Sequence, residues 1–305
     1  MVEAKASKLA AGRRDGLELN GEREKKVRFE AFDDWLPVEN ALVLLCVKTY
    51  DNAPVLARVS EREWLLPVQN GFDPQLGKSS HAFEGIAAFV SECESERPSA
   101  RVTRMGKLYL GGRRKLTPDQ NCVLQELAAA IQKGGWRDVR VVESIEPYKS
   151  SKLMYNAAIS PLAAAAGVDN GELLRDPVAQ RLFFALLREN YAILRRSGMK
   201  LARIGPFHPW VVNLILSIPG LAKTFAHFFR PSLSGTYCSM AADIESGRTE
   251  VAAYNGYLEQ LSKGTDCPIN VAVIRMLETM KEKCLKPSRN LLAGLQHSLE
   301  MGTPL

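Results

Sequence analysis

The sequence lacks the residue clusters that mark metal sites, disulfide frameworks and secretion. Its six cysteines lie far apart, with no C-x-x-C pair, which argues against a zinc site or a disulfide framework and is typical of a reducing cytosol. Its four histidines are equally scattered and no H-E-x-x-H occurs, so we expect no structural metal. The first residues are charged and show no apolar signal core. These absences predict a cytoplasmic protein.

Long apolar runs and strong charge of one sign are also missing. The most apolar late stretch, from Trp210 to Phe229, is interrupted by Pro219, Lys223 and His227, so it favours a buried helical hairpin over a membrane span. The net charge of +6 would favour anionic small molecules, but it is too diffuse to indicate nucleic acid. We therefore expect neither a membrane nor a nucleic-acid partner.

Two buried strands are predicted early in the chain. Ala41 to Val47 is a continuous apolar run, typical of a strand covered on both faces, and Trp64 to Val68 is a second such run. A short helix near residues 52–59 would join them, which suggests a doubly wound α/β sheet that binds ligands at the carboxyl ends of its strands. Lys48 and Asn70 follow those ends. A solvated lysine and a plain Asn-Gly turn remain open alternatives.

The rest of the chain changes character near residue 145. Short strands are predicted at residues 85–90, 100–105, 107–110 and 139–142, with a helix at 118–133 capped by Thr117. Further on, the pattern is helical near residues 147–166, 177–197, 208–229, 234–246, 249–263, 268–284 and 287–300. We therefore predict an α/β domain over residues 1–145 and an all-helical domain over residues 146–305.

The helix predicted after Glu146 carries polar side chains in line. Pro147 suits its first turn and Gly167 its end. Lys152, Asn156 and Ser160 are spaced four residues apart, so they stack along one face among apolar neighbours. Either these side chains reach the surface and have no chemical role, or they form part of a site.

Several motifs resemble the ketopantoate reductase (2-dehydropantoate 2-reductase) family. They occur in that family's order, at close to its spacing, and span nearly the whole chain. They are Val47-Lys48-Thr49-Tyr50, Gln69-Asn70-Gly71, Lys152-Leu153-x-x-Asn156, Ser239-Met240-x-x-Asp243-Ile244, Gly247-Arg248-Thr249-Glu250 and Asn255-Gly256-Tyr257.

The resemblance implies NADPH-dependent reduction of a 2-oxo acid to a 2-hydroxy acid, in pantothenate biosynthesis. Lys152 would be the general acid, since a protonated lysine can both polarise a ketone and supply the proton. Lys48 and Asn70 would lie near the nicotinamide end of the cofactor. The implied substrate-binding residues are Asn156, Ser160, Ser239 and Glu250.

The sequence departs from the family's pattern at three places. Ser160 stands where the family usually has a second asparagine. The segment from Asp243 to Glu250 is one residue shorter than usual, which would turn Glu250 by about a third of a turn in a continuous helix. The family's opening strand and G-x-G-x-x-G phosphate loop have no counterpart after Met1, which predicts a truncated dinucleotide-binding-like domain with an incomplete Rossmann-type sheet.

Two alternatives stay open beside a reductase whose true start lies upstream. One is a non-catalytic relative, a binding or scaffold protein that has lost dinucleotide binding. The other is an enzyme of the same architecture with another substrate, as in opine-type dehydrogenases. The apolar surface of the helical region is also compatible with a homodimer.

Overall fold

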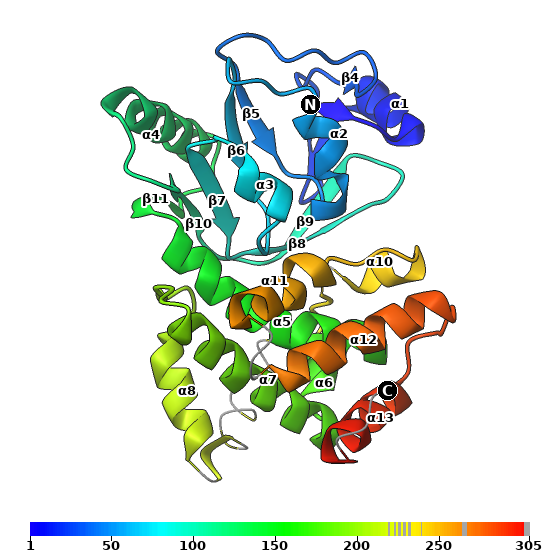
Figure 1. Ribbon diagram of the computed structural model, residues 1–305. Coiled ribbons are helices and arrows are strands. Elements are labelled where there is room, and N and C mark those ends of the chain that lie inside the picture. The colour runs from blue at the N-terminus through cyan, green and yellow to red at the C-terminus, as the bar shows by residue number, and fades with distance from the viewer. Residues whose placement is uncertain are drawn as a thin grey trace. The chain divides into compact units, whose positions relative to one another are not determined.

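The computed structural model describes residues 1–218, 220–222, 224, 227, 230, 233–238, 240–263 and 267–301. The chain divides into two compact units, which are described separately. Unit 1 comprises Met1–Leu45, Pro54–Val68 and Ser80–Glu143, and unit 2 comprises Cys46–Ala53, Gln69–Ser79 and Ser144–Leu305. Unit 1 mixes strands and helices and unit 2 is helical (Figure 1). The predicted fold class, an α/β region followed by an all-α region, is confirmed.

The main sheet of unit 1 contains both parallel and antiparallel neighbours. The parallel pair is β5–β6, and a parallel bridge from Val68 to Gly85 places β7 beside β6. β7 then pairs antiparallel with β10, and β10 has β11 on its other side (Figure 1). The strands span Leu42–Leu45 (β5), Trp64–Pro67 (β6), Phe83–Ala87 (β7), Leu108–Gly112 (β10) and Val139–Ser144 (β11).

Helix α4 (Pro118–Lys133) packs on this sheet. Thr117 caps the helix and Pro118 occupies its first turn, as the sequence predicts, and Gln120 completes a reciprocal capping box with Thr117. Leu124 of α4 packs with Phe83 and Leu110 of the sheet in one buried apolar cluster. Burial of each such side chain stabilises the unit by about 1.5–3 kcal/mol.

Smaller elements complete unit 1. Helix α1 (Ala6–Asp15) follows β1, which pairs parallel with β4, and a separate four-stranded sheet has the order β3-β2-β9-β8. The strands are Val2–Glu3 (β1), Leu17–Leu19 (β2), Glu22–Glu24 (β3), Glu30–Ala31 (β4), Val90–Cys93 (β8) and Ser99–Arg104 (β9).

The predictions around β5 need two corrections. The strand is not covered on both faces: Leu44 is 47% exposed. β5 pairs only with β6 among the described strands, so it is an edge strand there, and one of its faces stays partly open to solvent at Leu44. The helix expected at residues 52–59 is shorter and begins with a 3-10 turn, η1 (Thr49–Asp51), followed by α2 (Asn52–Leu56). Residues 48–51 of this segment belong to unit 2.

Helix α5 (Glu146–Ala166) forms the centre of unit 2 (Figure 1). It is buried along most of its length, and Gly167 ends it in the left-handed conformation with φ 69°, as predicted. The surrounding elements are α3 (Pro74–Lys78), α6 (Asn170–Leu173), α7 (Pro177–Arg196), α8 (Pro209–Ser217), α10 (Ala241–Glu245), η2 (Val251–Ala253), α11 (Asn255–Ser262), α12 (Pro268–Glu282) and α13 (Arg289–Met301).

Buried asparagines join α5 to its neighbours. Asn190 of α7 donates to the Met154 carbonyl of α5 at 3.0 Å, and Asn255 of α11 donates to the Ala157 carbonyl at 2.9 Å. Asn270 of α12 bonds to both asparagines at 2.8 Å. Since each amide is fully buried, these bonds fix how α5 is placed in the bundle.

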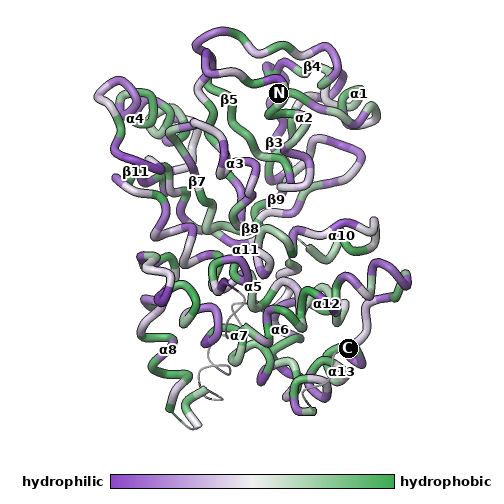
Figure 2. The backbone as a smooth tube through the Cα atoms, viewed as in Figure 1, coloured by the Kyte–Doolittle hydropathy of each residue, from purple (hydrophilic) through white to green (hydrophobic). Residues whose placement is uncertain are grey.

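Three helices differ from the sequence pattern. In the described part of residues 208–229, α8 is only partly buried: Val212 is 3% exposed and Trp210 is 52% exposed, and Figure 2 shows a largely hydrophobic helix. The rest of the expected hairpin lies mostly outside the described residues. Of the helix expected at 234–246, the described part is helical only over α10 (Ala241–Glu245), because residues 234–235 form a turn and residues 236–238 are irregular. The helix expected at 249–263 is broken into η2 and α11 at Tyr254. Within the described residues, no helix has both the length and the hydropathy to cross a bilayer.

Candidate functional site

A cation and two carboxylates form the most polar cluster in unit 2. The Lys48 Nζ donates to Asp243 Oδ2 at 2.7 Å and to Glu250 Oε2 at 3.1 Å. Glu250 is 4% exposed, and it also accepts from the Thr49 N–H and the Tyr254 hydroxyl, each at 3.4 Å. A buried carboxylate needs such partners because the apolar surroundings do not solvate it. The Glu250 side chain is therefore held on three sides.

The electrostatics of the cluster follow from this geometry. Burial alone would lower the pKa of Lys48, but Glu250 and Asp243 together raise it above its ordinary value of 10.5. Lys48 is thus a cation at neutral pH. One ammonium facing two carboxylates leaves the cluster with a net negative charge, so it suits a hydrogen-bond donor better than an anion.

Tyr50 and Arg248 extend this cluster outward. The Tyr50 hydroxyl donates to Asp243 Oδ1 at 3.0 Å. Burial and this bond raise the pKa of Tyr50 well above its ordinary value of 10.0. Arg248 lies over the Tyr50 ring, 4.8 Å from its centroid, and its guanidinium is 3.5 Å from an Asp51 oxygen. Tyr50 is therefore held on both its ring and its hydroxyl.

The segment that carries Asn70 is fixed by its neighbours. Gly71 has φ +72°, and a Cβ there would lie 2.6 Å from the Ala253 carbonyl oxygen. The Phe72 N–H donates to that same carbonyl at 2.9 Å. Asn70 itself is half-buried, and its side chain has no hydrogen bond to the residues that the structure describes. Its amide is therefore available to a ligand.

Phe72 connects this segment to the face of α5 that carries Lys152. Its ring stacks on Tyr257 at 4.5 Å, and the Lys149 Nζ lies 4.8 Å from its centroid. Lys152 lies three residues after Lys149 and four residues before Asn156, so the three side chains share one side of the helix. Lys152 is half-buried there. The face predicted to be functional is thus the one that meets the Asn70 segment.

Asn156 and Ser160, the two α5 residues predicted to bind substrate, differ in solvent exposure. Asn156 is half-buried, and its side chain makes no hydrogen bond to any described residue. Ser160 is buried, and its backbone carbonyl accepts from the Cys238 thiol at 3.3 Å. Burial raises the pKa of that thiol, and the nearby Lys48 charge partly opposes the shift. Ser239, the other residue predicted to bind substrate, lies outside the described residues.

The structure joins two residues that the sequence analysis assigned to different ligands. Lys48 was assigned to the cofactor and Glu250 to the substrate, yet they form an ion pair. Sequence reasoning missed Tyr50 and Asp243 as members of the site, although both stand in motifs that carry the family resemblance. Their positions could have indicated a role, since Tyr50 lies two positions after Lys48 and Asp243 lies seven positions before Glu250.

The shortened segment before Glu250 is not a continuous helix. Helix α10 ends at Glu245, Gly247 has φ +70°, and η2 begins only at Val251. The expected rotation of Glu250 by a third of a turn therefore does not apply, because a loop connects Asp243 to Glu250.

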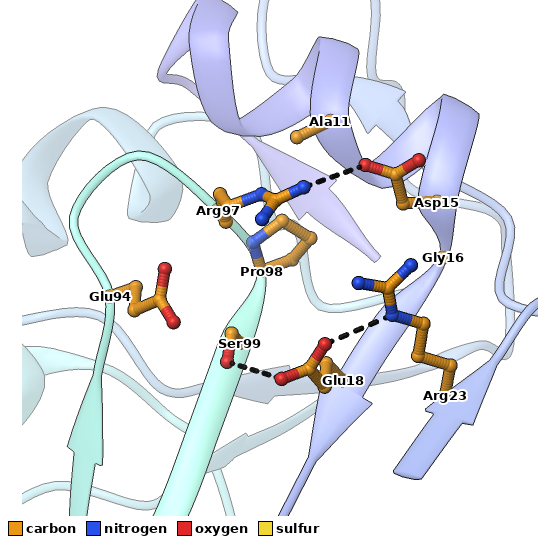
Figure 3. A pocket seen from close by; sticks show the side chains of 9 residues that line it. All are labelled: Ala11, Asp15, Gly16, Glu18, Arg23, Glu94, Arg97, Pro98 and Ser99. Carbon is orange, nitrogen blue, oxygen red and sulfur yellow. Dashed lines mark hydrogen bonds and ion pairs between the residues drawn. The ribbon is translucent and has the colours of Figure 1, made fainter. Parts of the chain in front are cut away.

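Two hollows lie away from these residues. In unit 1, a cavity of about 30 Å³ has room for little more than water, and four of its charged residues form ion pairs: Arg97 with Asp15 at 3.3 Å, and Arg23 with Glu18 at 3.0 Å (Figure 3). In unit 2, an open groove of about 610 Å³ lies between α7, α8 and the start of α12. Its one acid, Glu189, already caps α12 by accepting from the Ile269 and Asn270 N–H groups. Neither hollow offers a catalytic group.

Comparison with known proteins agrees with this geometry. Residues 144–281 match the family described as "Ketopantoate reductase PanE/ApbA C terminal". The matched region therefore resembles the C-terminal part of ketopantoate reductases. It includes Lys152, Asn156, Asp243 and Glu250 of the candidate site.

Relatives of known name cover most of the chain. The chain is 29% identical over 244 residues to the 2-dehydropantoate 2-reductase of Pyrobaculum aerophilum, covering 79% of this chain and 77% of that protein. It is 24% identical over 277 residues to the 2-dehydropantoate 2-reductase of Aquifex aeolicus, covering 85% and 82%.

Solved structures share the fold. A PanE/ApbA family ketopantoate reductase from Ralstonia eutropha matches with a TM-score of 0.69 at 20% identity, covering 92% of this chain and 89% of that chain. A D-mandelate dehydrogenase solved with NADH and anilino(oxo)acetate matches with a TM-score of 0.72 at 16% identity, covering 92% and 90%. Because these sequence identities are below 25%, the similarity shows a shared fold and nothing more.

Proposed function

We propose that this protein is an oxidoreductase that uses NADPH to reduce a 2-oxo acid, 2-dehydropantoate, to its 2-hydroxy acid. The observation that carries the proposal is the face of α5, where a half-buried Lys152 is followed one turn later by Asn156, whose amide has no hydrogen bond to the described residues. The names of the similar proteins supply the substrate class.

Lys152 is the proposed general acid. Its ammonium donates a hydrogen bond to the ketone oxygen and then gives up a proton from Nζ as the carbon is reduced, so that the oxygen becomes a hydroxyl. A cation beside that oxygen also stabilises the negative charge that develops on it. A reduced nicotinamide, when bound, supplies the hydride. The neutral Lys152 amine then regains a proton from solvent.

The substrate is held by amide and carboxylate groups. Asn156 donates to the substrate one helical turn from Lys152, and Ser160 and Ser239 are further proposed donors to the substrate. Glu250, already fixed by Lys48, accepts a hydrogen bond from a hydroxyl of the substrate. These roles for Asn156, Ser160, Ser239 and Glu250 are proposals that rest on their positions in the family's motifs.

The donor groups fit the nicotinamide end of a dinucleotide. Asn70 offers an amide without a hydrogen-bond partner in the described chain, which suits a carboxamide or a ribose hydroxyl. Lys48 lies beside the same region. The basic start of α1 does not fit a phosphate, because Glu96 already accepts from Lys5 and from the Ser7 hydroxyl. We assign no residue to the pyrophosphate.

The test is NADPH oxidation with 2-dehydropantoate, compared among the wild type, Lys152→Ala and Lys281→Ala. Lys281 is an exposed lysine of α12 and serves as the matched control. We expect Lys152→Ala to lower kcat by about 10²–10⁴-fold, the usual worth of a general acid, while Lys281→Ala retains wild-type rates. Wild-type rates in Lys152→Ala would remove Lys152 from its role. No oxidation by the wild type would favour a non-catalytic relative.

We also propose a homodimer. A dimeric ketopantoate reductase from Staphylococcus aureus has a similar fold, with a TM-score of 0.62. Light scattering on the purified protein would give twice the mass of one chain.

A further inference from the structure

Two residues outside the proposed catalytic set control the position of two residues within it. Asp243 accepts from the Lys48 ammonium at 2.7 Å and from the Tyr50 hydroxyl at 3.0 Å, using a different oxygen for each. Lys48 in turn donates to Glu250 at 3.1 Å. The contacts form a chain from Tyr50 through Asp243 and Lys48 to Glu250, and all four residues belong to unit 2.

The arrangement limits where the Lys48 ammonium can lie. The ammonium has three donors, and Asp243 and Glu250 occupy two of them. The Tyr50 bond fixes the orientation of the Asp243 carboxylate, and Arg248 over the Tyr50 ring fixes Tyr50. Asp243 therefore adds a second carboxylate to Glu250 in holding the Lys48 side chain, which is one-third exposed.

We propose that Asp243 and Tyr50 are positioning residues that hold Lys48 against Glu250, and that the resulting negatively charged cluster selects a 2-oxo acid with a hydroxyl group over one with a second carboxylate. The specificity part rests on the proposed reductase function. Its physical basis is charge: two carboxylates share one ammonium, so a hydroxyl donor can bind Glu250, whereas a further carboxylate is repelled.

The positioning part is tested without measuring activity. Reductive methylation followed by mass spectrometry reports the rate at which Lys48 reacts, and only its neutral amine reacts. Asp243→Asn removes a neighbouring charge, so we expect the Lys48 rate to rise about tenfold, as one pKa unit implies. Tyr50→Phe should give a smaller rise. Asp34→Asn and Tyr237→Phe, which alter exposed residues, are the matched controls. Equal Lys48 rates in all five proteins would overturn the positioning role.

The specificity part is tested by kinetics on three substrates: 2-dehydropantoate, which carries a hydroxyl, 2-oxoisovalerate, which lacks it, and 2-oxoglutarate, which carries a second carboxylate. We expect Asp243→Asn and Tyr50→Phe to raise KM for 2-dehydropantoate about tenfold, with kcat changed less than about threefold. KM for 2-oxoisovalerate should stay constant, and KM for 2-oxoglutarate should fall in Asp243→Asn.

The outcomes separate this proposal from the function on which it rests. Equal changes of KM for all three substrates, in variants with wild-type circular dichroism, would overturn the selective role. If the wild type reduced none of the three acids, the proposed function and the specificity part would both fail, and the methylation rates would still decide the positioning role. Tyr50→Phe removes a single hydroxyl, so it keeps the test usable if Asp243→Asn unfolds.

Discussion

The ammonium nitrogen of Lys48 lies 3.1 Å from a carboxylate oxygen of Glu250, although the two residues are 202 positions apart in the sequence. The pair joins the turn after β5 to the loop between α10 and η2. A short polar contact between two such distant segments holds two parts of the candidate site together, and its loss should be measurable as a change in stability.

Replacing Lys48 by methionine should destabilise the protein. The change leaves Asp243 and Glu250 facing each other without a cation, and Glu250 is buried. Because Lys48 is partly exposed, we expect a loss of about 1–3 kcal/mol in the free energy of unfolding, below the value for a fully buried pair. Urea denaturation of the wild type and the variant measures this loss. Lys48→Arg keeps the charge and should lose less, and Lys281→Met is the surface control. An equal loss in Lys48→Met and Lys48→Arg would contradict the account.

The contribution of Lys48 to stability should depend on pH at the alkaline end. Its folded pKa is raised above the ordinary 10.5, so the folded protein holds this proton more tightly than the unfolded chain. The contribution is therefore fully present below pH 10.5 and is lost as the pH rises through the folded pKa. The difference in unfolding free energy between the wild type and Lys48→Met should stay constant at neutral pH and shrink above pH 10.5. If the difference in unfolding free energy grew above pH 10.5, the raised folded pKa of Lys48 would be contradicted.

Gly71→Ala should be more costly than an alanine at a glycine of similar backbone conformation. Gly71 has φ +72° and no space for a Cβ beside the Ala253 carbonyl, whereas Gly198 has φ +75° and open space. Both changes strain the backbone, at about 1–3 kcal/mol. Gly71→Ala should cost about 1–3 kcal/mol more, because a clash is added. Thermal unfolding measures the destabilisation of each variant, and the difference between the two gives the cost of the clash. Equal destabilisation would mean that the Asn70 segment is not docked on Ala253.

Asn270→Ala should destabilise the helical unit strongly. The Asn270 side chain bonds to Asn190, Asn255 and Glu189, so its removal leaves buried polar atoms without partners. We expect a loss of about 2–4 kcal/mol, measured by urea denaturation. Asn290→Ala, at an exposed position of α13, should cost less than about 0.5 kcal/mol. A small effect of Asn270→Ala would show that these amides do not fix α5.

Local signals in the sequence predicted much of the fold. Pro147 and Gly167 mark the ends of α5, and Thr117 with Pro118 marks the start of α4, because caps and first-turn prolines act within a few residues. The spacing of Lys152 and Asn156 likewise predicted that they share a helix face. These features depend on neighbours along the chain.

Features that depend on distant contacts were not predictable. The break at Tyr254 occurs where Phe72 bonds to Ala253 and Lys48 reaches Glu250, and no local pattern contains those contacts. Leu44 is 47% exposed because no other layer of the described residues covers its face of β5 fully, although the apolar run of that strand favours full burial. Tyr50 and Asp243 were missed as site residues because their role depends on a hydrogen bond between segments 193 positions apart.

The most direct test of the central claim is transfer of a labelled hydride. The purified protein is incubated with 2-dehydropantoate and with NADPH that carries deuterium at the transferred position. The masses of the acid products are then measured by mass spectrometry. The account predicts a 2-hydroxy acid that has gained one deuterium on the carbon of the former ketone, formed by the wild type and Lys281→Ala and strongly reduced in Lys152→Ala. Absence of deuterated product with the folded wild-type protein would contradict it.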